Sequence, residues 1–340
     1  MGSRFRILLS VVAVLVATGL LMPASVAGQS ADDGWTLPRT PDGHPDLGGV
    51  WANNSATPLE RPEAWADKER LTDEELAALL VASDDAVGDG DALFGDQLVL
   101  AAIDGIEATS YDPTTGNYNQ FWIAERDFDN RTSLVIDPPD GRIPDLTPEA
   151  QERRRHGVAR LDEHPADTYT DRPLQERCVS YGVPRLGAGY NSYYQVFQSA
   201  DHVVFLNEMI HDARVIPIDG QPHLADRVRQ LHGDSRGHWD GDTLVIETTN
   251  YSPQARFRGA SDNLHMVERL TRVGPRTLDY EVTITDPTTW TRPWTVMIPL
   301  MGSDDAIFEY ACHEGNIGME GILAGHRAEE RETTAESGSK

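Results

Sequence analysis

The sequence predicts a mainly β protein, an antiparallel β-barrel or sandwich with two short helices. Apolar and polar residues alternate in short runs such as 242–249 and 278–285, and this period of two is typical of strands with one buried face. Asp-Gly pairs that begin at Asp140, Asp219 and Asp240 separate such runs and suit tight hairpin turns. Little helical periodicity lies between the runs, which favours an antiparallel sheet over a parallel one. The expected strands are 118–124, 132–137, 193–198, 203–209, 213–218, 243–249, 265–272, 278–285, 294–299 and 306–312.

The two helices are expected where capping residues precede polar segments. Thr72-Asp73-Glu74-Glu75 forms a capping box, in which the threonine and the glutamate three residues later bind the first free backbone N–H groups. This helix is expected to end near Ala82. The second helix is expected to begin at Thr147-Pro148 and to end near Leu161, because the fixed φ of proline suits the first helical position.

The N-terminal residues are expected to form a signal peptide, residues 1–27. Arg4 and Arg6 precede an apolar run from Ile7 to Leu21, and small residues before the cut suit signal peptidase. The run is about 15 residues long, which is short for a membrane span. An uncleaved anchor is the alternative. The mature protein is therefore expected in the periplasm or outside the cell, with no integral membrane segment after cleavage.

Three further parts follow the signal peptide. Residues 28–62 are expected to form an extended arm rich in proline and glycine, because proline is excluded from helix interiors and central strands. Trp51 in this arm is an aromatic anchor for docking on the body. Residues 63–327 are expected to form a single β-rich domain. The polar, charged tail, residues 328–340, is expected to be disordered.

The composition limits the partners and cofactors. The formal net charge is −26, which argues against nucleic acid or an anionic membrane surface as a partner. Neither a phosphate-binding glycine loop nor a dinucleotide fingerprint is present, and no cofactor is predicted. Cys178 and Cys312 are the two cysteines. In an oxidising compartment they are expected to form a disulfide, with two buried thiols as the alternative.

Histidine, carboxylate and arginine side chains near the expected strands are candidates for acid–base catalysis. His313 and His211 are the candidate proton-transfer residues, with Glu314 or Glu268 as the carboxylate that orients them. Arg214 is the candidate clamp for an oxyanion or carboxylate. The structural alternative is an ion pair between Glu208 and Arg214 with His211 on the surface. His265 completes the candidate catalytic set.

Other residues are candidates for ligand and metal binding. An apolar cavity with a few polar groups is the usual form of a small-molecule site, although aromatic residues also serve as core packing. The candidate aromatic ligand-binding residues are Trp239, Trp294, Tyr310 and Tyr194. A transition metal is the alternative to a metal-free site, with His238, His265 and His313 as its ligands.

Four segments resemble a large group of secreted bacterial proteins of unassigned activity. The resemblance covers nearly the whole mature chain and supports a single secreted domain, but it implies no substrate. The last strands are also loosely similar to lipocalin-like barrels, whose calyx holds small apolar ligands. The segments that carry the first resemblance are residues 38–51, with Pro-Asp-Leu-Gly-Gly-Val-Trp, 137–144, 237–244, with Gly-His-Trp-Asp-Gly-Asp-Thr-Leu, and 309–316, with Glu-Tyr-Ala-Cys-His-Glu-Gly-Asn.

Two functional hypotheses follow from these observations. The first is a secreted or periplasmic enzyme that uses His/Glu/Arg acid–base chemistry on a small, partly apolar organic molecule, as a lyase, isomerase, cyclase or hydrolase. The second is a non-catalytic carrier that binds a small molecule in the same barrel. The recurrence of acidic and basic side chains at strand positions favours the enzyme.

Overall fold

The computed structural model describes residues 34–87, 93, 96–104, 125–182, 184–188, 190–254 and 257–338. The chain divides into two compact units, Met1–Trp35 and Thr36–Lys340, and all the elements below belong to the second. The expected signal peptide and the expected strand 118–124 lie outside the described residues.

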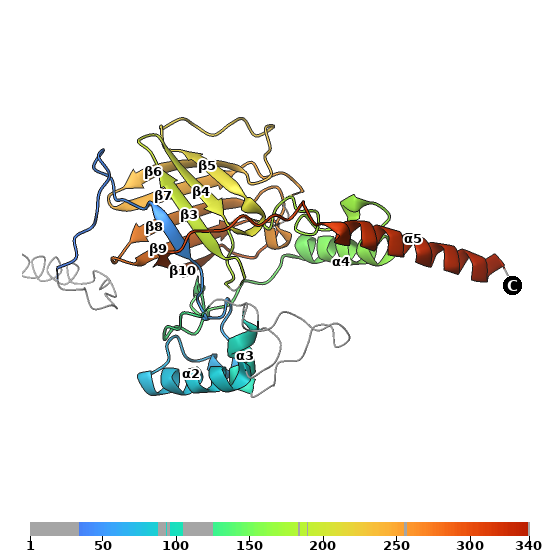
Figure 1. Ribbon diagram of the computed structural model, residues 1–340, viewed down its shortest axis with the longest axis horizontal. Helices are drawn as coiled ribbons and strands as arrows, with labels where there is room; N and C mark the ends of the chain where they lie inside the picture. The colour runs from blue at the N-terminus through green and yellow to red at the C-terminus, as the bar shows by residue number, and fades with distance from the viewer. Residues whose placement is uncertain are drawn as a thin grey trace, which may run out of the picture. The chain divides into compact units, whose positions relative to one another are not determined.

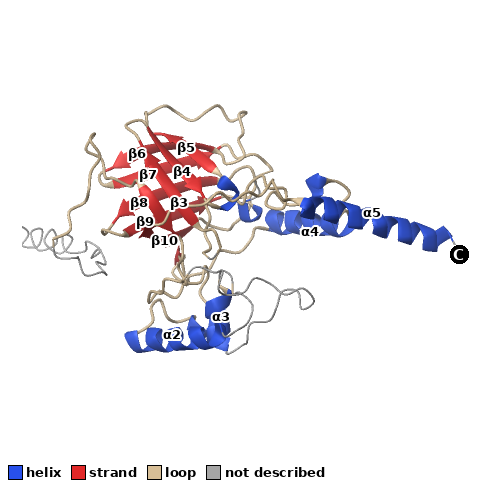
Figure 2. Ribbon diagram, in the orientation of Figure 1, coloured by secondary structure: helices blue, strands red, loops and turns tan. Residues whose placement is uncertain are grey.

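The centre of this unit is an antiparallel sheet of ten strands. Figure 1 labels β3 to β10 of this sheet, and Figure 2 shows its strands in red. The strand order is β5-β4-β3-β1-β10-β9-β8-β7-β6, and β2 pairs with β10. The predicted fold class, a mainly antiparallel β protein, is therefore confirmed. The strands are β1 Gly49–Ala52, β2 Val135–Asp137, β3 Tyr193–Gln198, β4 His202–Asn207, β5 Ala213–Pro217, β6 Asp234–Asp240, β7 Thr243–Thr249, β8 His265–Arg272, β9 Thr277–Thr285 and β10 Trp294–Ser303.

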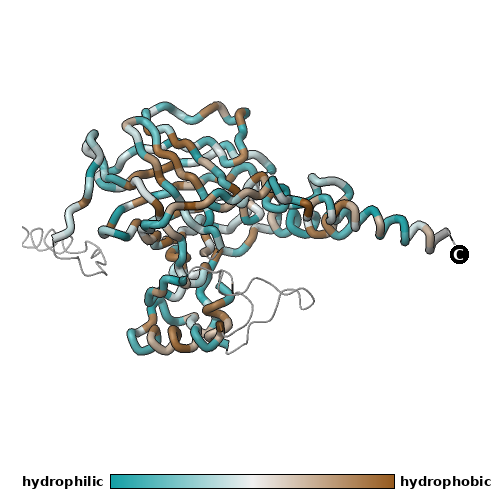
Figure 3. The backbone as a smooth tube through the Cα atoms, viewed as in Figure 1, coloured by the Kyte–Doolittle hydropathy of each residue, from teal (hydrophilic) through white to brown (hydrophobic). Residues whose placement is uncertain are grey.

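Alternation along the strands gives the sheet one apolar face. In β9, Leu278, Tyr280, Val282 and Ile284 are buried and the residues between them are partly exposed. The strands accordingly carry both hydrophobic and hydrophilic residues in Figure 3. Buried side chains of β1 to β5 and β7 to β10 belong to one hydrophobic cluster, against which the partly buried Trp239 of β6 packs. We call the space that they fill the sheet interior.

The predicted hairpin at Asp240-Gly241 is confirmed. β6 and β7 pair from Asp234 with Thr249 to Asp240 with Thr243. Gly241 has a φ of 60°, which glycine adopts without the steric cost that a side chain brings. This hairpin places β6 at one edge of the sheet, and β5 forms the other edge.

The two edge strands meet at Gly237. A Cβ atom at this position would lie 2.6 Å from Cγ2 of Ile218 and 3.2 Å from Cγ2 of Ile216. These isoleucines lie at the end of β5 and directly after it. Side chains from the two edges therefore pack where the ladder of strand pairs ends, and the sheet is barrel-like without being closed by hydrogen bonds between the described β5 and β6 residues.

Replacing Gly237 with valine is expected to lower the free energy of unfolding by about 1–3 kcal/mol, because the added methyl groups overpack this junction. Chemical denaturation measures the change. The matched control is Gly241→Val in the hairpin turn, where a Cβ meets no atom within 4 Å and the cost comes from φ alone. An unchanged unfolding midpoint in Gly237→Val contradicts close packing between β5 and β6.

Helices occupy the parts of the chain around the sheet. Both predicted helices are present, and the capping box at Thr72 is formed, with the Glu75 N–H donating to Thr72 Oγ1 over 3.2 Å. Thr147 caps the other predicted helix by accepting from the Ala150 N–H over 3.1 Å. The helices are α2 Asp73–Val87, α3 Gln97–Asp104, α4 Pro148–Glu163 and α5 Ile317–Gly338, with short 3-10 helices η1 Glu63–Trp65, η3 Tyr169–Asp171, η4 Met209–His211 and η5 Phe257–Gly259.

Several expectations differ from the structure. The strand β6 was not expected, and the described residues form four α-helices where two were expected. Asp140-Gly141 and Asp219-Gly220 do not join paired strands, because β2 pairs with β10 and β5 and β6 are opposite edges of the sheet. Residues 49–52 of the expected arm form β1, which lies between β3 and β10 with Trp51 almost fully buried. The run 306–312 forms no strand, because no neighbouring strand pairs with it. Residues 328–338, which were expected to be disordered, belong to α5. The interactions of α5 with Asp167 are described below.

Candidate functional site

The sheet interior contains a group of polar side chains, which we call the interior cluster: Arg214, Thr248, Tyr251, Glu268 and Tyr280. Strand alternation places four of them on the buried face of β5, β7, β8 and β9, and Tyr251 follows β7. All five are buried, and Glu268 has no exposed surface. The neighbours of Glu268 on the same face of β8 are Met266 and Leu270, so the cluster is polar within an apolar surrounding.

The Glu268 carboxylate is the centre of the cluster. Arg214 Nη2 donates to both of its oxygens, over 2.9 Å to Oε1 and 2.8 Å to Oε2. The Tyr280 hydroxyl donates to Oε1, and the Thr248 hydroxyl donates to Oε2 over 3.4 Å. Ser235 Oγ lies 2.9 Å from Thr248 Oγ1. Five strands thus contribute to one hydrogen-bonded network.

Burial and the charge of Glu268 shift the pKa values of the arginine and tyrosine side chains in and around this network. Burial alone would lower the pKa of Arg214, but the adjacent Glu268 carboxylate holds it above its ordinary value. Burial, followed by the Glu268 charge, raises the pKa values of Tyr280 and Tyr251. Burial also raises the pKa of Tyr194 to about 12. The tyrosines therefore remain neutral hydrogen-bond donors around an Arg–Glu pair at physiological pH.

One donor of the cluster, the buried Arg214 Nε, has no hydrogen-bond partner. The Tyr251 hydroxyl interacts with Thr248, and this interaction works against the rise that burial causes in the pKa of Tyr251. A buried donor without an acceptor costs about 1–3 kcal/mol, and a bound water or ligand oxygen is one way in which such a donor is satisfied.

The Tyr251 ring also lines a small hollow that opens next to the cluster. The hollow has a volume of about 10 Å³, room for about one water molecule. Asp212 organises its polar side: Ser180 Oγ donates to Asp212 Oδ2 over 2.8 Å, and His232 Nε2 lies 3.5 Å from Asp212 Oδ1. The hollow is lined by Leu174, Ser180, Gly182, Leu231, His232, Tyr251 and Phe257.

The structure brings together two of the predicted catalytic residues and separates the others from them. Arg214 pairs with Glu268, and not with Glu208 as in the structural alternative. His265 points to the other face of β8, where its Nε2 lies 2.7 Å from Glu247 Oε1. His211 is exposed, in η4. His313 and Glu314 are exposed in the segment before α5.

The predicted aromatic ligand-binding residues occupy different places. Trp294 is fully buried and packs edge-on against Trp290 at 5.5 Å. Tyr194 packs edge-on against Tyr280, at 6.4 Å between ring centroids. Tyr194 is therefore the one of the four that contacts the interior cluster. Trp239 stacks on His44 at 4.9 Å, and Tyr310 packs edge-on against Tyr190.

The predicted disulfide between Cys178 and Cys312 is present. It joins the segment that lines the hollow to the segment before α5. The alternative metal ligands do not converge: His238 is exposed on β6, and His265 is paired with Glu247. Among the described residues, the carboxylate and imidazole groups that do converge as metal ligands are those of Asp167, His326 and Glu330.

Sequence reasoning missed several residues of the site. Tyr280 and Thr248 lie in predicted strands, and their burial parity with Val282 and Ile246 was the signal that could have placed them inside. Tyr251, Ser180, Asp212 and His232 lie in connections, where no period applies. Their convergence depends on long-range folding alone.

Comparison with known proteins leaves the family open. No protein-family model matches the chain, and no curated protein matches it. A crystal structure of a "secretary abundant heat soluble (SAHS) protein" from Ramazzottius varieornatus is similar at 10% sequence identity with a TM-score of 0.23. The match covers 43% of this chain and 84% of that chain. In the part of the chain that the structure describes, no helix has both the length and the apolar character needed to cross a membrane.

Proposed function

We propose that this protein binds a small organic molecule beside the interior cluster, and that it does so in the periplasm or outside the cell. The observation that supports this most directly is the buried Arg214–Glu268 pair, whose Arg214 Nε has no hydrogen-bond partner. A buried ion pair is often no more stabilising than apolar side chains of the same volume. Stability alone therefore does not account for the pair. The disulfide supports the location, because structural disulfides persist in oxidising compartments.

The chemistry of the cluster indicates the kind of ligand. Arg214 Nε and the Tyr251 hydroxyl are both donors, so the complementary ligand group is an acceptor oxygen, as in a carbonyl, carboxylate or sulfonate. Phe205 lies against the guanidinium of Arg214, at 5.9 Å from its ring centroid. This aromatic ring and Met266 on β8 favour an apolar ligand body. Together they define a small, partly apolar molecule with one oxygen-bearing group.

Ligand entry requires a movement at the hollow. The volume of about 10 Å³ admits one water, whereas small-molecule sites usually measure about 300–1,000 Å³. Residues 174–182 line one side of the hollow and are attached to the rest of the protein by the disulfide at Cys178. Displacement of this segment would open the hollow and give a ligand access to Tyr251.

Acid–base catalysis at the same place is the second candidate. It is favoured by the hydrogen bond from the neutral Tyr280 hydroxyl to the Glu268 carboxylate, which places a proton donor and a proton acceptor side by side. The exposed histidines, His211 and His313, take no part in this version. Recovery of a bound compound separates the two functions: a carrier returns it unchanged, whereas an enzyme returns a converted or, in D₂O, a deuterium-labelled compound.

The binding test uses 8-anilinonaphthalene-1-sulfonate, an apolar dye with acceptor oxygens. We expect the native protein to bind it saturably, and we expect Arg214→Met/Glu268→Leu to bind it about tenfold or more weakly, because this change removes the charged donor. Dye fluorescence in a titration measures the affinity. Near-ultraviolet circular dichroism verifies that each variant keeps its tertiary packing.

The matched control is Arg269→Met/Asp240→Leu. Arg269 is the next residue on β8 but lies on the outer face, where its Nη2 is 2.9 Å from Asp240 Oδ2. This pair has the same chemistry without the burial, and its removal is expected to leave dye affinity unchanged. No saturable binding by the native protein, or equal affinity in the inner and outer double variants, contradicts the proposed site.

A further inference from the structure

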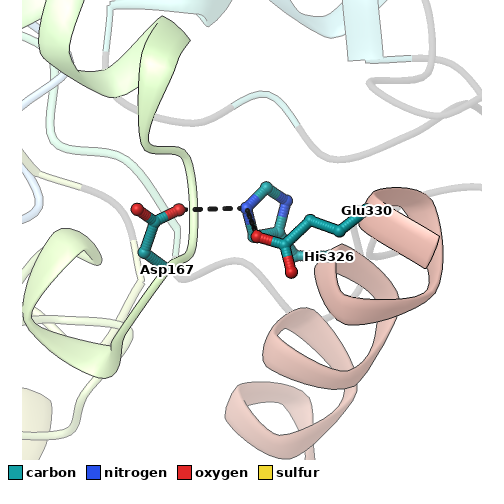
Figure 4. Close-up of side chains that lie close together, drawn as sticks. All are labelled: Asp167, His326 and Glu330. Atoms are coloured by element: carbon teal, nitrogen blue, oxygen red, sulfur yellow. Dashed lines mark hydrogen bonds and ion pairs between the residues drawn. The ribbon is translucent and has the colours of Figure 1, made fainter. Parts of the chain in front are cut away.

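A second group of side chains lies away from the sheet interior, where α5 meets the segment that follows α4. Asp167 lies in that segment, and His326 and Glu330 lie one turn apart on α5. Figure 4 shows the three side chains pointing toward one another. One ligand atom from each lies within 4.8 Å of the other two. We call this group the α5 cluster.

We propose that the α5 cluster is a binding site for a divalent transition metal, with Zn²⁺ as the best-fitting ion. Asp167 Oδ1 and Glu330 Oε1 lie 3.2 Å and 3.6 Å from His326 Nε2. Two ligands bound to zinc at about 2.0–2.1 Å with tetrahedral geometry lie about 3.3 Å apart. The two distances from His326 Nε2 thus fit the edges of one coordination tetrahedron, the two oxygens lie within 4.8 Å of one another, and water would supply the fourth ligand.

Groups around the α5 cluster hold its ligands in place. His164 Nδ1 lies 2.7 Å from Asp167 Oδ2, the carboxylate oxygen that faces away from His326. Glu329 Oε2 lies 3.8 Å from His326 Nδ1, the ring nitrogen that the metal does not use, which is too far for a hydrogen bond. A carboxylate that hydrogen-bonds the second ring nitrogen is the usual partner of a metal-binding histidine, and Glu329 would have to move closer to His326 to serve as one.

Arg327 is the cation nearest to the ligands. Its Nη2 donates to Oε1 of Glu330 over 3.0 Å and lies 4.0 Å from Asp167 Oδ1, and its Nε lies 2.7 Å from Oε2 of Glu330 as an ion pair. Each carboxylate oxygen has two lone pairs, so Glu330 Oε1 retains one for a metal. With Asp167, Glu329 and Glu330 ionised, one arginine leaves the group with two negative charges, which match a divalent ion.

Isothermal titration of the full, metal-stripped chain with ZnCl₂ tests the proposal. We expect one site for which His326→Ala lowers the affinity about tenfold or more, with a similar loss in the isosteric Glu330→Gln. Co²⁺ is a second probe, because its visible absorption reports tetrahedral coordination by nitrogen and oxygen. Far-ultraviolet circular dichroism verifies that α5 remains helical in both variants.

The matched control is His156→Ala on α4. His156 and Glu152 are also one turn apart, with Nε2 of the histidine 2.9 Å from Oε1 of the glutamate. Among the described residues this pair belongs to no group of three potential ligands, so its loss is expected to leave Zn²⁺ affinity unchanged. Absence of binding, or equal affinity in His326→Ala and the native protein, overturns the proposal.

Discussion

Replacing Glu268 with leucine is expected to lower the free energy of unfolding by about 3–5 kcal/mol, because it leaves the Arg214 guanidinium buried without a counterion. The Tyr280 hydroxyl loses its acceptor in the same variant. Adding Arg214→Met removes the uncompensated charge and is expected to restore most of the lost stability. Urea unfolding of the two variants and the native protein measures these differences.

This comparison separates two roles of the interior cluster. If Arg214→Met/Glu268→Leu is as stable as the native protein and no longer binds the dye, the ion pair serves ligand binding and not stability. If the free energy of unfolding of Glu268→Leu lies within about 1 kcal/mol of the native value, the buried Arg214–Glu268 pair is contradicted. An unpaired buried charge destabilises a protein by more than that. The outer pair, Arg269 and Asp240, supplies the reference value for an exposed ion pair, about 0–1 kcal/mol.

The second large effect is expected at the disulfide. Cys178 and Cys312 are 134 residues apart. Closing a loop of this length lowers the entropy of the unfolded chain, which raises the free energy of unfolding by about 4–5 kcal/mol at 25 °C. Cys178→Ser/Cys312→Ser is therefore expected to unfold at a lower denaturant concentration. Unfolding curves with and without dithiothreitol measure the loss.

The serine variant is also the control for this experiment. Dithiothreitol is expected to lower the unfolding midpoint of the native protein to that of Cys178→Ser/Cys312→Ser and to leave the variant unchanged. An equal midpoint for the oxidised and reduced native protein contradicts a stabilising role of the bond. The segment next to Cys178 lines the hollow, so the same samples also report whether dye binding depends on the disulfide.

Strands with strong alternation and a tight turn were predictable from sequence. The β8 and β9 strands are the clearest examples, because buried and partly exposed residues alternate along both; the turn at Asp240-Gly241 was predicted, whereas β6 before it has no such alternation and was not expected as a strand. The run 306–312 alternates equally well but forms no strand, since alternation records only which residues could share a face. β1 was missed because its four residues lie in a segment rich in proline and glycine, which predicts no strand. They form one because β3 and β10 pair with them on both sides.

The interior cluster could be predicted only in part. Arg214 and Glu268 were candidates because of their residue type, and the structure places them together. The sequence could not distinguish Glu268 from Glu247, which lies on a neighbouring strand but is half exposed. A shift of one residue in register exchanges the two faces, and register depends on partners far away in the chain. Glu330 was missed because a polar segment without a clear apolar stripe resembles a disordered tail, and His326, just before that expected tail, was missed because no metal-ligand spacing links it to Asp167 in the sequence.

The position of β1 also determines when the protein can fold. Val50 pairs with Ser303, and Trp51 pairs with Tyr194 on its other side. The centre of the sheet therefore joins the beginning of the described chain to a strand near its end. Contacts with such long sequence separation form slowly, because the entropy of closing the loop is lost before the contacts stabilise the structure. Because β10 follows β3 to β9 in the chain, the β1–β10 pairs can form only after these strands, whereas β1 and β3 can pair without β10.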